Sequence, residues 1–273
     1  MNILVLGGHG MAGHVIVEYL RRCGHHVLYT VRKEDPKGIL LDVRDLENVR
    51  KVVSEHKVEI VINATGLLND YAETHVKEAI QVNSLLPHLL MDMVNEYGGK
   101  LIHISTDCVF SGDKGNYTEN AQKDGWNVYS QSKSLGEIET PPHLTVRTSI
   151  IGPELKKDGI GLLHWFLQQR GNIKGYKNVF WNGVTTLELA KAIQALIVEN
   201  ISGLYHLSVD QKISKYELLL LFKEIFEHDE VDIIPVDEPV HDKTLIHTRR
   251  DYKFPVKSYR EMLNELREWM KGE

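Results

Sequence analysis

Apolar residues in the first half of the chain gather in short continuous runs, separated by stretches in which they recur every three or four positions. Runs such as 2–6 and 58–63 predict strands that are buried on both faces. In 45–56, Leu46, Val49 and Val53 share one side and predict an amphipathic helix. The same reasoning predicts strands at 2–6, 26–30, 38–42, 58–63, 101–105 and 144–147, and helices at 11–22, 45–56, 73–97 and 127–139.

This alternation of strands and helices predicts an α/β fold, a doubly wound parallel sheet of the Rossmann type with helices on both faces. The predicted domain covers residues 1–150. The pattern then loosens, and a smaller C-terminal lobe is predicted over 151–273, of which about 185–208 returns to the main sheet. The lobe has predicted helices at 160–170, 185–199, 214–227 and 256–271, and strands at 179–184, 204–208 and 231–235.

Length and composition are ordinary for a globular protein of one large or two modest domains. Every apolar run is shorter than the roughly 18 residues that cross a membrane, and the first one reads as a strand and not as a leader. The net charge of −6 argues against nucleic acid as a partner. Cys23 and Cys108 give neither a disulfide framework nor a metal signature. We therefore expect no metal, and a reducing cytoplasm as the compartment.

Three glycines stand where the first strand turns into the first helix. They have the spacing Gly7-x-x-Gly10-x-x-Gly13, and His9 and Met11 lie inside the turn. Without a Cβ the backbone can approach a pyrophosphate closely, and the start of the helix supplies N–H donors. A tight structural turn is the alternative, but the position between a strand and a helix favours a dinucleotide site.

The segments 7–13, 63–66 and 105–107 all follow predicted strands, and doubly wound sheets bind ligands at the carboxyl ends of their strands. Arg32 and Lys33 stand where an acidic residue would bind the ribose of NAD, so they predict a grip on the 2′-phosphate of NADPH. NADH is the alternative if both are solvated surface charges. The other residues predicted to border the cofactor are Asp42, Val43, Asn63, Ala64, Thr65, Asn83 and Ser105.

Tyr129 and Lys133 stand four residues apart in a predicted helix, so their side chains should share one face. A neighbouring ammonium lowers the pKa of a phenol, which would make Tyr129 a proton donor to a carbonyl that accepts hydride. Thr106, at the end of a predicted strand, would donate a hydrogen bond to the same oxygen. Asn83 would anchor a water or the Lys133 side chain, or is a satisfied polar residue of the core.

Together these motifs resemble the extended short-chain dehydrogenase/reductase superfamily, and within it the dTDP-4-dehydrorhamnose reductase family. The resemblance covers the first 150 residues and thins afterwards; it is carried by segments 6–13, 42–45, 63–65, 82–83, 105–112, 117–119, 129–137 and 146–149. It implies NADPH- or NADH-dependent reduction of the 4-keto group of a nucleotide-linked 6-deoxy sugar, in polysaccharide biosynthesis. It also implies that Thr106, Tyr129 and Lys133 are catalytic and that Val109, Phe110 and Arg147 face the substrate. Asp107 and Cys108, between Thr106 and Val109, are predicted to bind the substrate as well.

The pair Asp107-Cys108 separates related chemistries. Nucleotide-sugar 4,6-dehydratases carry Asp-Glu at this point, so the cysteine disfavours dehydration. GDP-fucose synthases pair a cysteine here with a histidine, so the resemblance also permits an epimerase-reductase in which His164 partners Cys108. We favour a small buried hydrophobe for Cys108. A capsular-sugar subgroup shares Thr-Asp-Cys-Val-Phe, which argues against rhamnose as the product.

The C-terminal lobe offers charge and aromatic surface for the rest of a nucleotide-diphosphate sugar. Arg249 or Arg250 is predicted to grip the diphosphate, because a guanidinium binds phosphate in a bidentate way. Trp181 is predicted to cover the base or the sugar. The alternatives are solvated charge for the arginines and core packing for the tryptophan.

One relative of the family, the β subunit of methionine adenosyltransferase, binds a dinucleotide and serves a partner enzyme. A non-catalytic regulatory subunit is therefore the alternative to an enzyme, although a pure binding role requires neither Tyr129 nor Lys133. By analogy with relatives, helices 73–97 and 127–139 would form the two-fold bundle of a homodimer.

Overall fold

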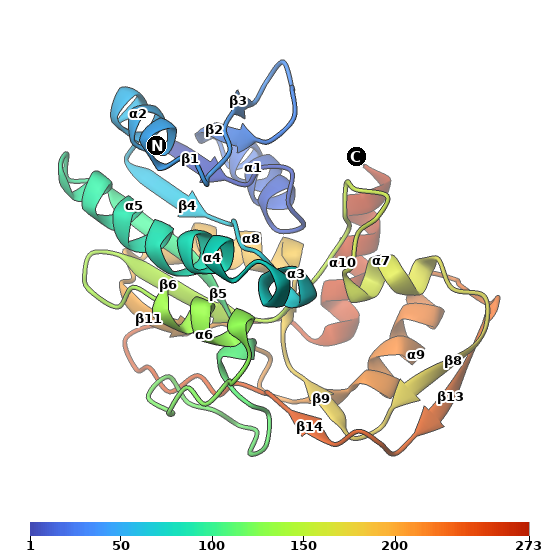
Figure 1. Ribbon diagram of the computed structural model, residues 1–273. Coiled ribbons are helices and arrows are strands. Elements are labelled where there is room, and N and C mark those ends of the chain that lie inside the picture. Colours follow the sequence, from blue (N-terminus) through green and yellow to red (C-terminus); the bar gives the residue numbers. More distant parts are fainter. Residues whose placement is uncertain (273) are drawn as a thin grey trace.

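The computed structural model describes residues 1–272 and is built around one sheet of seven parallel strands (Figure 1). The predicted doubly wound α/β fold is confirmed. The strand order reverses direction at β1, from which the chain builds outward to both sides. In order across the sheet the strands are β11 (Gly203–His206), β6 (Leu144–Thr148), β5 (Lys100–Thr106), β4 (Ile60–Asn63), β1 (Asn2–Leu6), β2 (His26–Val31) and β3 (Ile39–Leu40).

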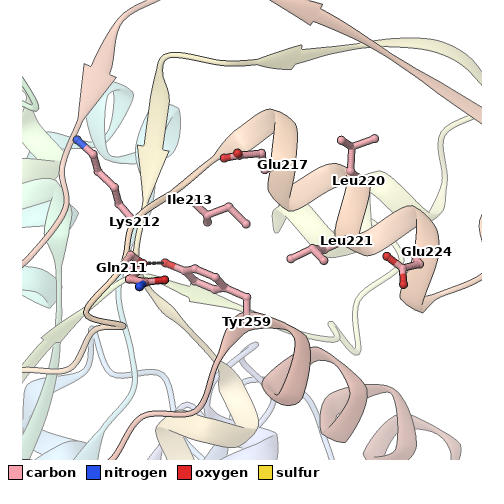
Figure 2. Close-up of a pocket in the computed structure, with 8 residues that line it drawn as sticks. All are labelled: Gln211, Lys212, Ile213, Glu217, Leu220, Leu221, Glu224 and Tyr259. Atoms are coloured by element: carbon pink, nitrogen blue, oxygen red, sulfur yellow. Dashed lines mark hydrogen bonds between the residues drawn. The ribbon is translucent and has the colours of Figure 1, made fainter.

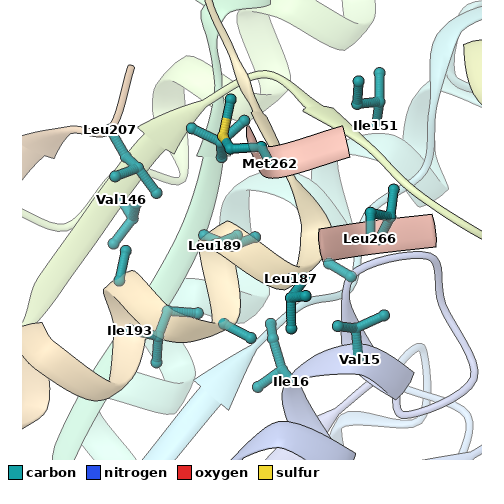
Figure 3. Packing of buried hydrophobic residues seen from close by; sticks show 14 of the residues in the cluster. Val15, Ile16, Val146, Ile151, Leu187, Leu189, Ile193, Leu207, Met262 and Leu266 are labelled. Atoms are coloured by element: carbon teal, nitrogen blue, oxygen red, sulfur yellow. The ribbon is translucent and has the colours of Figure 1, made fainter. Parts of the chain in front are cut away.

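Helices cover both faces of this sheet because successive strand residues point to opposite sides. In β1, Ile3 and Val5 belong to the core beneath α1 (Gly13–Arg22) and α8 (Thr186–Val198). Leu4 and Leu6 belong to the core beneath α2 (Leu46–His56) and α5 (Leu86–Asn95). Figure 3 shows the first core, where side chains of α1, α8 and α10 (Tyr259–Lys271) interdigitate.

The chain after β6 forms smaller sheets beside the main one (Figure 1). β10 pairs with β7, β9 lies between β12 and β14, and β13 pairs with β8. The helices of this part are α7 (Leu162–Leu167), α9 (Lys215–Ile225) and α10. Strand β11 belongs to the main sheet, and α8 packs beside α1 on one face of it. The strands are β7 (Ile150–Ile151), β8 (Gly171–Tyr176), β9 (Val179–Trp181), β10 (Val184–Thr185), β12 (Ile213–Ser214), β13 (Val231–Val236) and β14 (His241–Asp242).

One predicted helix is divided in the structure, and the strands β7, β8, β12 and β14 were not predicted. The helix expected at 73–97 is divided into α3 (Asn69–Thr74), α4 (Val76–Ala79), a π-helix η1 (Ile80–Leu85) and α5. η1 packs against the end of α6 (Val128–Leu135), so closely that a Cβ on Gly136 would clash with the Asn83 carbonyl oxygen. Strand β8 was not predicted, because only Ile173 and Gly175 of its residues are buried and the alternation is weak.

Within residues 1–272, no helix combines the length and the apolar character that crossing a bilayer requires. The same part of the chain contains no group of three or more His, Cys, Asp or Glu side chains arranged to hold a metal ion.

Candidate active site

The functional motifs meet at the carboxyl edge of the main sheet. Leu6 at the end of β1 lies opposite Asn63 at the end of β4, and Asn63 lies opposite His103 of β5. β5 continues to Thr106, where a short 3-10 turn η2 (Asp107–Val109) begins. Parallel neighbours thus place the glycine turn, Asn63 and Thr106 along one edge, beside the point where the strand order reverses.

The glycine turn has the shape that a dinucleotide requires. Gly7 has φ +84°, a conformation that favours glycine, and a Cβ on Gly13 would clash with the Gly7 carbonyl oxygen. The turn is closed by a hydrogen bond of 2.8 Å from Gly10 N–H to Gly7 O. Within residues 1–272, the N–H groups of Met11 and Ala12 at the start of α1 find no acceptor. These free donors and the helix dipole fit a pyrophosphate.

The far side of the turn is held by an acidic residue that follows β2. Asp35 accepts hydrogen bonds from Tyr29 Oη at 2.9 Å and pairs with His9 Nε2 at 2.8 Å. Backbone and side-chain donors, first of all the Lys37 N–H, lower the pKa of Asp35. Arg32 and Lys33 project into solvent at the end of β2, at the edge where the 2′-phosphate of a bound dinucleotide would lie.

The remaining residues predicted to border the cofactor differ in how far protein neighbours already engage them. Asp42 is engaged by the Arg44 guanidinium, which lowers the pKa of this carboxyl, and Val43 is buried beside it. Ala64 and Thr65 pack directly against Gly7, where a Cβ would meet Thr65 Cγ2 at 3.0 Å. These two residues therefore form the floor of the turn.

Helix α6 carries the two residues of the Tyr-x-x-x-Lys motif. Its first turn is capped by Asn127, whose side chain accepts from Ser130 N–H at 2.7 Å, and by Glu73 of α3, which accepts from Val128 N–H at 2.8 Å. Tyr129 and Lys133 are 8% and 4% exposed, so both lie on the buried face of the helix. The shared helix face that the spacing predicts is therefore present.

The expected acidification of Tyr129 is wrong for this structure. Burial is the largest cause and raises the pKa of the phenol, the nearby Cys108 adds to the rise, and the neighbouring Thr106 only partly offsets it. Thr106 and Tyr129 therefore lie close together, and Thr106 Oγ1 donates to Asp107 Oδ1 at 3.1 Å and accepts from Cys108 N–H at 3.1 Å. The Lys133 amine, however, is directed away, to Ile104 O at 2.8 Å and His103 Nε2 at 3.2 Å. Burial lowers the pKa of Lys133 to about 8.

Asn83 does not anchor Lys133, contrary to one of its predicted roles. Its side chain accepts from Leu67 N–H and donates to Leu67 O, both at 2.9 Å, and donates to Ser132 Oγ at 3.0 Å. All these partners are protein atoms and Asn83 is fully buried. The residue therefore fixes the loop after β4 to α6 and does not reach a cofactor.

Four residues predicted to contact ligands instead form the core beneath the site. Arg147 is 1% exposed and binds Glu137 with two hydrogen bonds of 2.8 and 2.6 Å. Ser105 donates to the same carboxylate at 2.7 Å. Phe110 lies under the Arg147 guanidinium and stacks on Tyr117, and Val109 belongs to the same buried cluster. The predictions that Arg147, Phe110 and Val109 face the substrate and Ser105 the cofactor are wrong, because these side chains satisfy one another.

Asp107 and Cys108 stand beside Tyr129 in a desolvated corner. Burial raises the pKa of Asp107 and raises that of Cys108 to about 11, so the thiol is protonated at neutral pH. His164 does not partner Cys108; it contacts Lys157 O at 3.2 Å and Gln168 Nε2 at 2.7 Å. The raised pKa and the absence of a His164 contact among residues 1–272 argue against a reactive thiol, while Cys108 itself is only partly buried.

Two lysines at this corner were not predicted. Lys215, the first residue of α9, and Lys243 both act electrostatically on Asp107 and Cys108. Lys215 Nζ lies 5.2 Å from the ring centre of Trp181, and within residues 1–272 neither ammonium has a carboxylate partner at ion-pair distance. Burial lowers the pKa of Lys215 to about 8. A lysine in a first helical turn opposes the helix dipole, and that was the only signal in the sequence.

The arginines predicted to bind diphosphate lie at the wrong end of the sheet. Arg249 Nη1 donates to the carbonyl oxygens of Ser202 and Leu204, at the amino end of β11, and its guanidinium pairs with Asp251. Arg250 follows on the exposed loop. Because ligands bind beyond the carboxyl ends, neither is placed to reach the site, and the prediction for both is wrong.

Trp181 is only 4% exposed and packs against Tyr259, at 5.7 Å between ring centres, so core packing accounts for most of its surface. A separate hollow of about 420 Å³ between β12, α9 and the start of α10 is lined by eight residues, among them Lys212, Glu217 and Tyr259 (Figure 2). It contains none of the predicted site residues and is not the candidate active site.

The chain is similar to known proteins over most of its length. The family described as RmlD substrate binding domain matches residues 1–260. The dTDP-4-dehydrorhamnose reductase of Escherichia coli is 28% identical over 237 residues, which cover 82% of this chain and 78% of that protein. Methionine adenosyltransferase 2 subunit beta of Danio rerio is 24% identical over 259 residues, covering 87% and 77%. The dTDP-4-dehydrorhamnose reductase of Bacillus anthracis in complex with NADP has a TM-score of 0.85 at 22% identity, covering 98% and 99%.

Proposed function

Because the chain belongs to the RmlD substrate binding domain family, we propose that it is an NADPH-dependent reductase of a nucleotide-linked 4-keto-6-deoxy sugar. The resemblance to the extended short-chain dehydrogenase/reductases, and among them to the dTDP-4-dehydrorhamnose reductases, is confirmed by this match and by relatives of that name. The named relatives are too distant to identify the substrate, so the nucleotide and the sugar are left open.

One observation carries the proposal. Tyr129, on the buried face of α6, lies close to Thr106 at the carboxyl edge of the sheet, where the glycine turn also lies. Two hydroxyls at such a position can both direct protons at one carbonyl oxygen.

Residues of the chain would supply the proton for the carbonyl oxygen and orient the carbonyl group. Thr106 would donate a hydrogen bond to the carbonyl oxygen, and Tyr129 would transfer its proton as negative charge develops there. Lys133, once its ammonium faces the phenol, would lower the pKa of Tyr129 and hold the ribose hydroxyls of the cofactor. Burial excludes water from all three groups and strengthens these interactions.

The cofactor we propose is NADPH, which when bound would supply the hydride. The free N–H groups of Met11 and Ala12 would hold its pyrophosphate, and exposed Arg32 and Lys33 would hold the 2′-phosphate. NADH would bind the same turn without the last two contacts. The protein is proposed to work in the cytoplasm, as a homodimer through the helices around η1 and α6.

The experiment that tests the function is a screen of 4-keto nucleotide sugars, with dTDP, UDP and GDP carriers, followed by the absorbance of NADPH. We expect oxidation of NADPH with at least one substrate and a 4-hydroxy product by NMR. If NADPH binds but no keto sugar is turned over, the reductase proposal fails.

Lys215 is proposed to bind an anionic part of the substrate beside the sugar, in place of the arginines. Replacing it by alanine should raise KM for the sugar nucleotide about tenfold, because a charge-assisted contact is lost. The matched control is Lys212→Ala, since Lys212 is paired with Asp242 at 2.7 Å and covers Phe180. Equal KM values for Lys215→Ala and the unaltered protein would exclude this role.

Two alternatives follow from the same site. An epimerase-reductase would incorporate solvent deuterium beside the ketone in a manner that depends on Cys108, and the raised pKa of the thiol argues against it. The likeness to methionine adenosyltransferase 2 subunit beta keeps a regulatory role as the second candidate. Cofactor binding without turnover, together with a stable complex with such a transferase, would favour that candidate.

A further inference from the structure

Three buried polar side chains, Asn63 of β4, His103 of β5 and Lys133 of α6, form a hydrogen-bonded row. Asn63 and His103 are direct neighbours on the parallel strands β4 and β5, and both are fully buried. Lys133 reaches the row from α6, with its Nζ 3.2 Å from His103 Nε2. The hydrogen-bond roles along this row can be assigned from one end to the other.

The orientation of the Asn63 amide is set by Thr65. Asn63 Oδ1 accepts from Thr65 N–H at 3.1 Å and from Thr65 Oγ1 at 2.6 Å. Turning the amide would direct its NH₂ group at the Thr65 N–H, two donors face to face. The NH₂ group therefore faces His103 Nδ1 at 3.2 Å, and Nδ1 is an acceptor.

A neutral imidazole carries one proton, so an accepting Nδ1 leaves that proton on Nε2, directed at Lys133 Nζ. An ammonium has no lone pair and would face this donor with donors of its own. The uncharged amine can accept the Nε2–H and still donate to Ile104 O, which lies at 2.8 Å. The row is therefore complementary to the uncharged form of Lys133.

Two opposing effects bring the charged and uncharged forms of Lys133 close in free energy near neutral pH. Burial opposes the ammonium and lowers the pKa of Lys133 to about 8, whereas Glu137, which follows the end of α6, favours the ammonium. Burial first, then Lys133 and His88, hold the pKa of His103 well below its ordinary value, so the ring is neutral. The titratable groups on α6 and on the elements packed against it are Tyr129 and Lys133 on α6, Asp70, Tyr71 and Glu73 on α3, Lys77 and Glu78 on α4, Lys100 and His103 on β5, and Asp107 and Cys108 on η2. His88, Lys123 and Glu137 lie around the end of α6, where His88 and Lys123 contact the carbonyl oxygens of Leu135 and Ser134.

We propose that His103, oriented by Asn63, is a positioning residue that holds Lys133 in a withdrawn position by stabilising its uncharged amine. Protonation of Lys133 removes the acceptor for the Nε2–H, and the ammonium is released toward Tyr129 and the cofactor ribose. The part played by Lys133 in turnover rests on the proposed function. The tautomer of His103 and the pKa of Lys133 are properties of the free protein.

The test compares His103→Gln and Asn63→Asp with the unaltered protein. A glutamine oxygen can accept from the ammonium, and an aspartate at 63 would accept an Nδ1–H and leave Nε2 as an acceptor. Both variants should raise the pKa of Lys133 by about one unit, because the preference for the uncharged amine is lost. The alkaline limb of the kcat/KM profile should move to higher pH by the same amount.

The pKa is read in the free protein from the ¹³Cε shift of Lys133, and the tautomer from ¹⁵N shifts of His103. The matched control is His143→Gln, which removes another buried histidine that accepts from Leu101 N–H at 3.1 Å. This control should lower stability without moving the pKa of Lys133.

An Nδ1–H tautomer of His103, or an unchanged Lys133 pKa in a folded His103→Gln variant, would overturn the inference. A protein that reduces no sugar nucleotide still yields both NMR readings, so the inference and the proposed function can fail separately.

Discussion

Replacing Tyr129 by phenylalanine is expected to lower turnover about 100- to 10,000-fold, the range for loss of a positioned general acid. The phenol is the proton donor that the proposed reaction places beside the carbonyl oxygen, close to the Thr106 hydroxyl. Phenylalanine keeps the buried ring, so folding and cofactor affinity should be retained. Single-turnover oxidation of NADPH and the quenching of protein fluorescence by the cofactor measure the two effects.

The control for this substitution is Tyr97→Phe. Tyr97 Oη is buried and finds no hydrogen-bond partner among residues 1–272, so its removal should alter neither turnover nor stability. Normal turnover in the Tyr129→Phe variant would remove Tyr129 from the mechanism.

Replacing Arg147 by methionine is expected to lower the free energy of unfolding by about 3–5 kcal/mol, the usual cost of removing one partner of a buried ion pair. The substitution would leave the fully buried Glu137 carboxylate with only Lys123, at 3.2 Å, as a cationic partner. It would also remove the donor to His206 Nε2 at 2.8 Å. Urea denaturation followed by circular dichroism measures the change.

Arg50→Met is the matched control for Arg147. Arg50 pairs with Glu96 at 2.8 Å, but both side chains are at least half exposed, so the loss should cost about 1 kcal/mol or less. A folded Arg147→Met variant with unchanged stability and a raised KM would show instead that Arg147 faces the substrate.

Local sequence patterns predicted the parts of the site that depend on neighbours in the chain. The Gly7–Gly13 turn follows from a strand, a tight bend and a helix in succession, and the pairing of Tyr129 with Lys133 follows from one helical turn. The continuous apolar runs predicted the parallel sheet, because only strands buried on both faces have that pattern. The π-helix η1, which lies close against the end of α6, was not predicted.

Polar residues next to the motifs were predicted less well. Arg147 and Ser105 sit in matching segments of the family, but a one-dimensional pattern does not distinguish a polar group that meets a ligand from one that meets Glu137. Lys215 lies 86 residues after Tyr129 by numbering and was missed, because its position depends on how α9 docks beside η2.

The sequence by itself determined the doubly wound α/β fold, the glycine turn and the family, since each depends on periodicity and short-range spacing. The tertiary structure decided which charges are free and which are paired. In the folded protein, Arg147 is buried against Glu137, and Arg249 lies at the amino end of β11. The Lys133 amine contacts His103. Hydrogen-bond partners and desolvation come from segments far apart in the chain, and these set the charge and direction of each side chain.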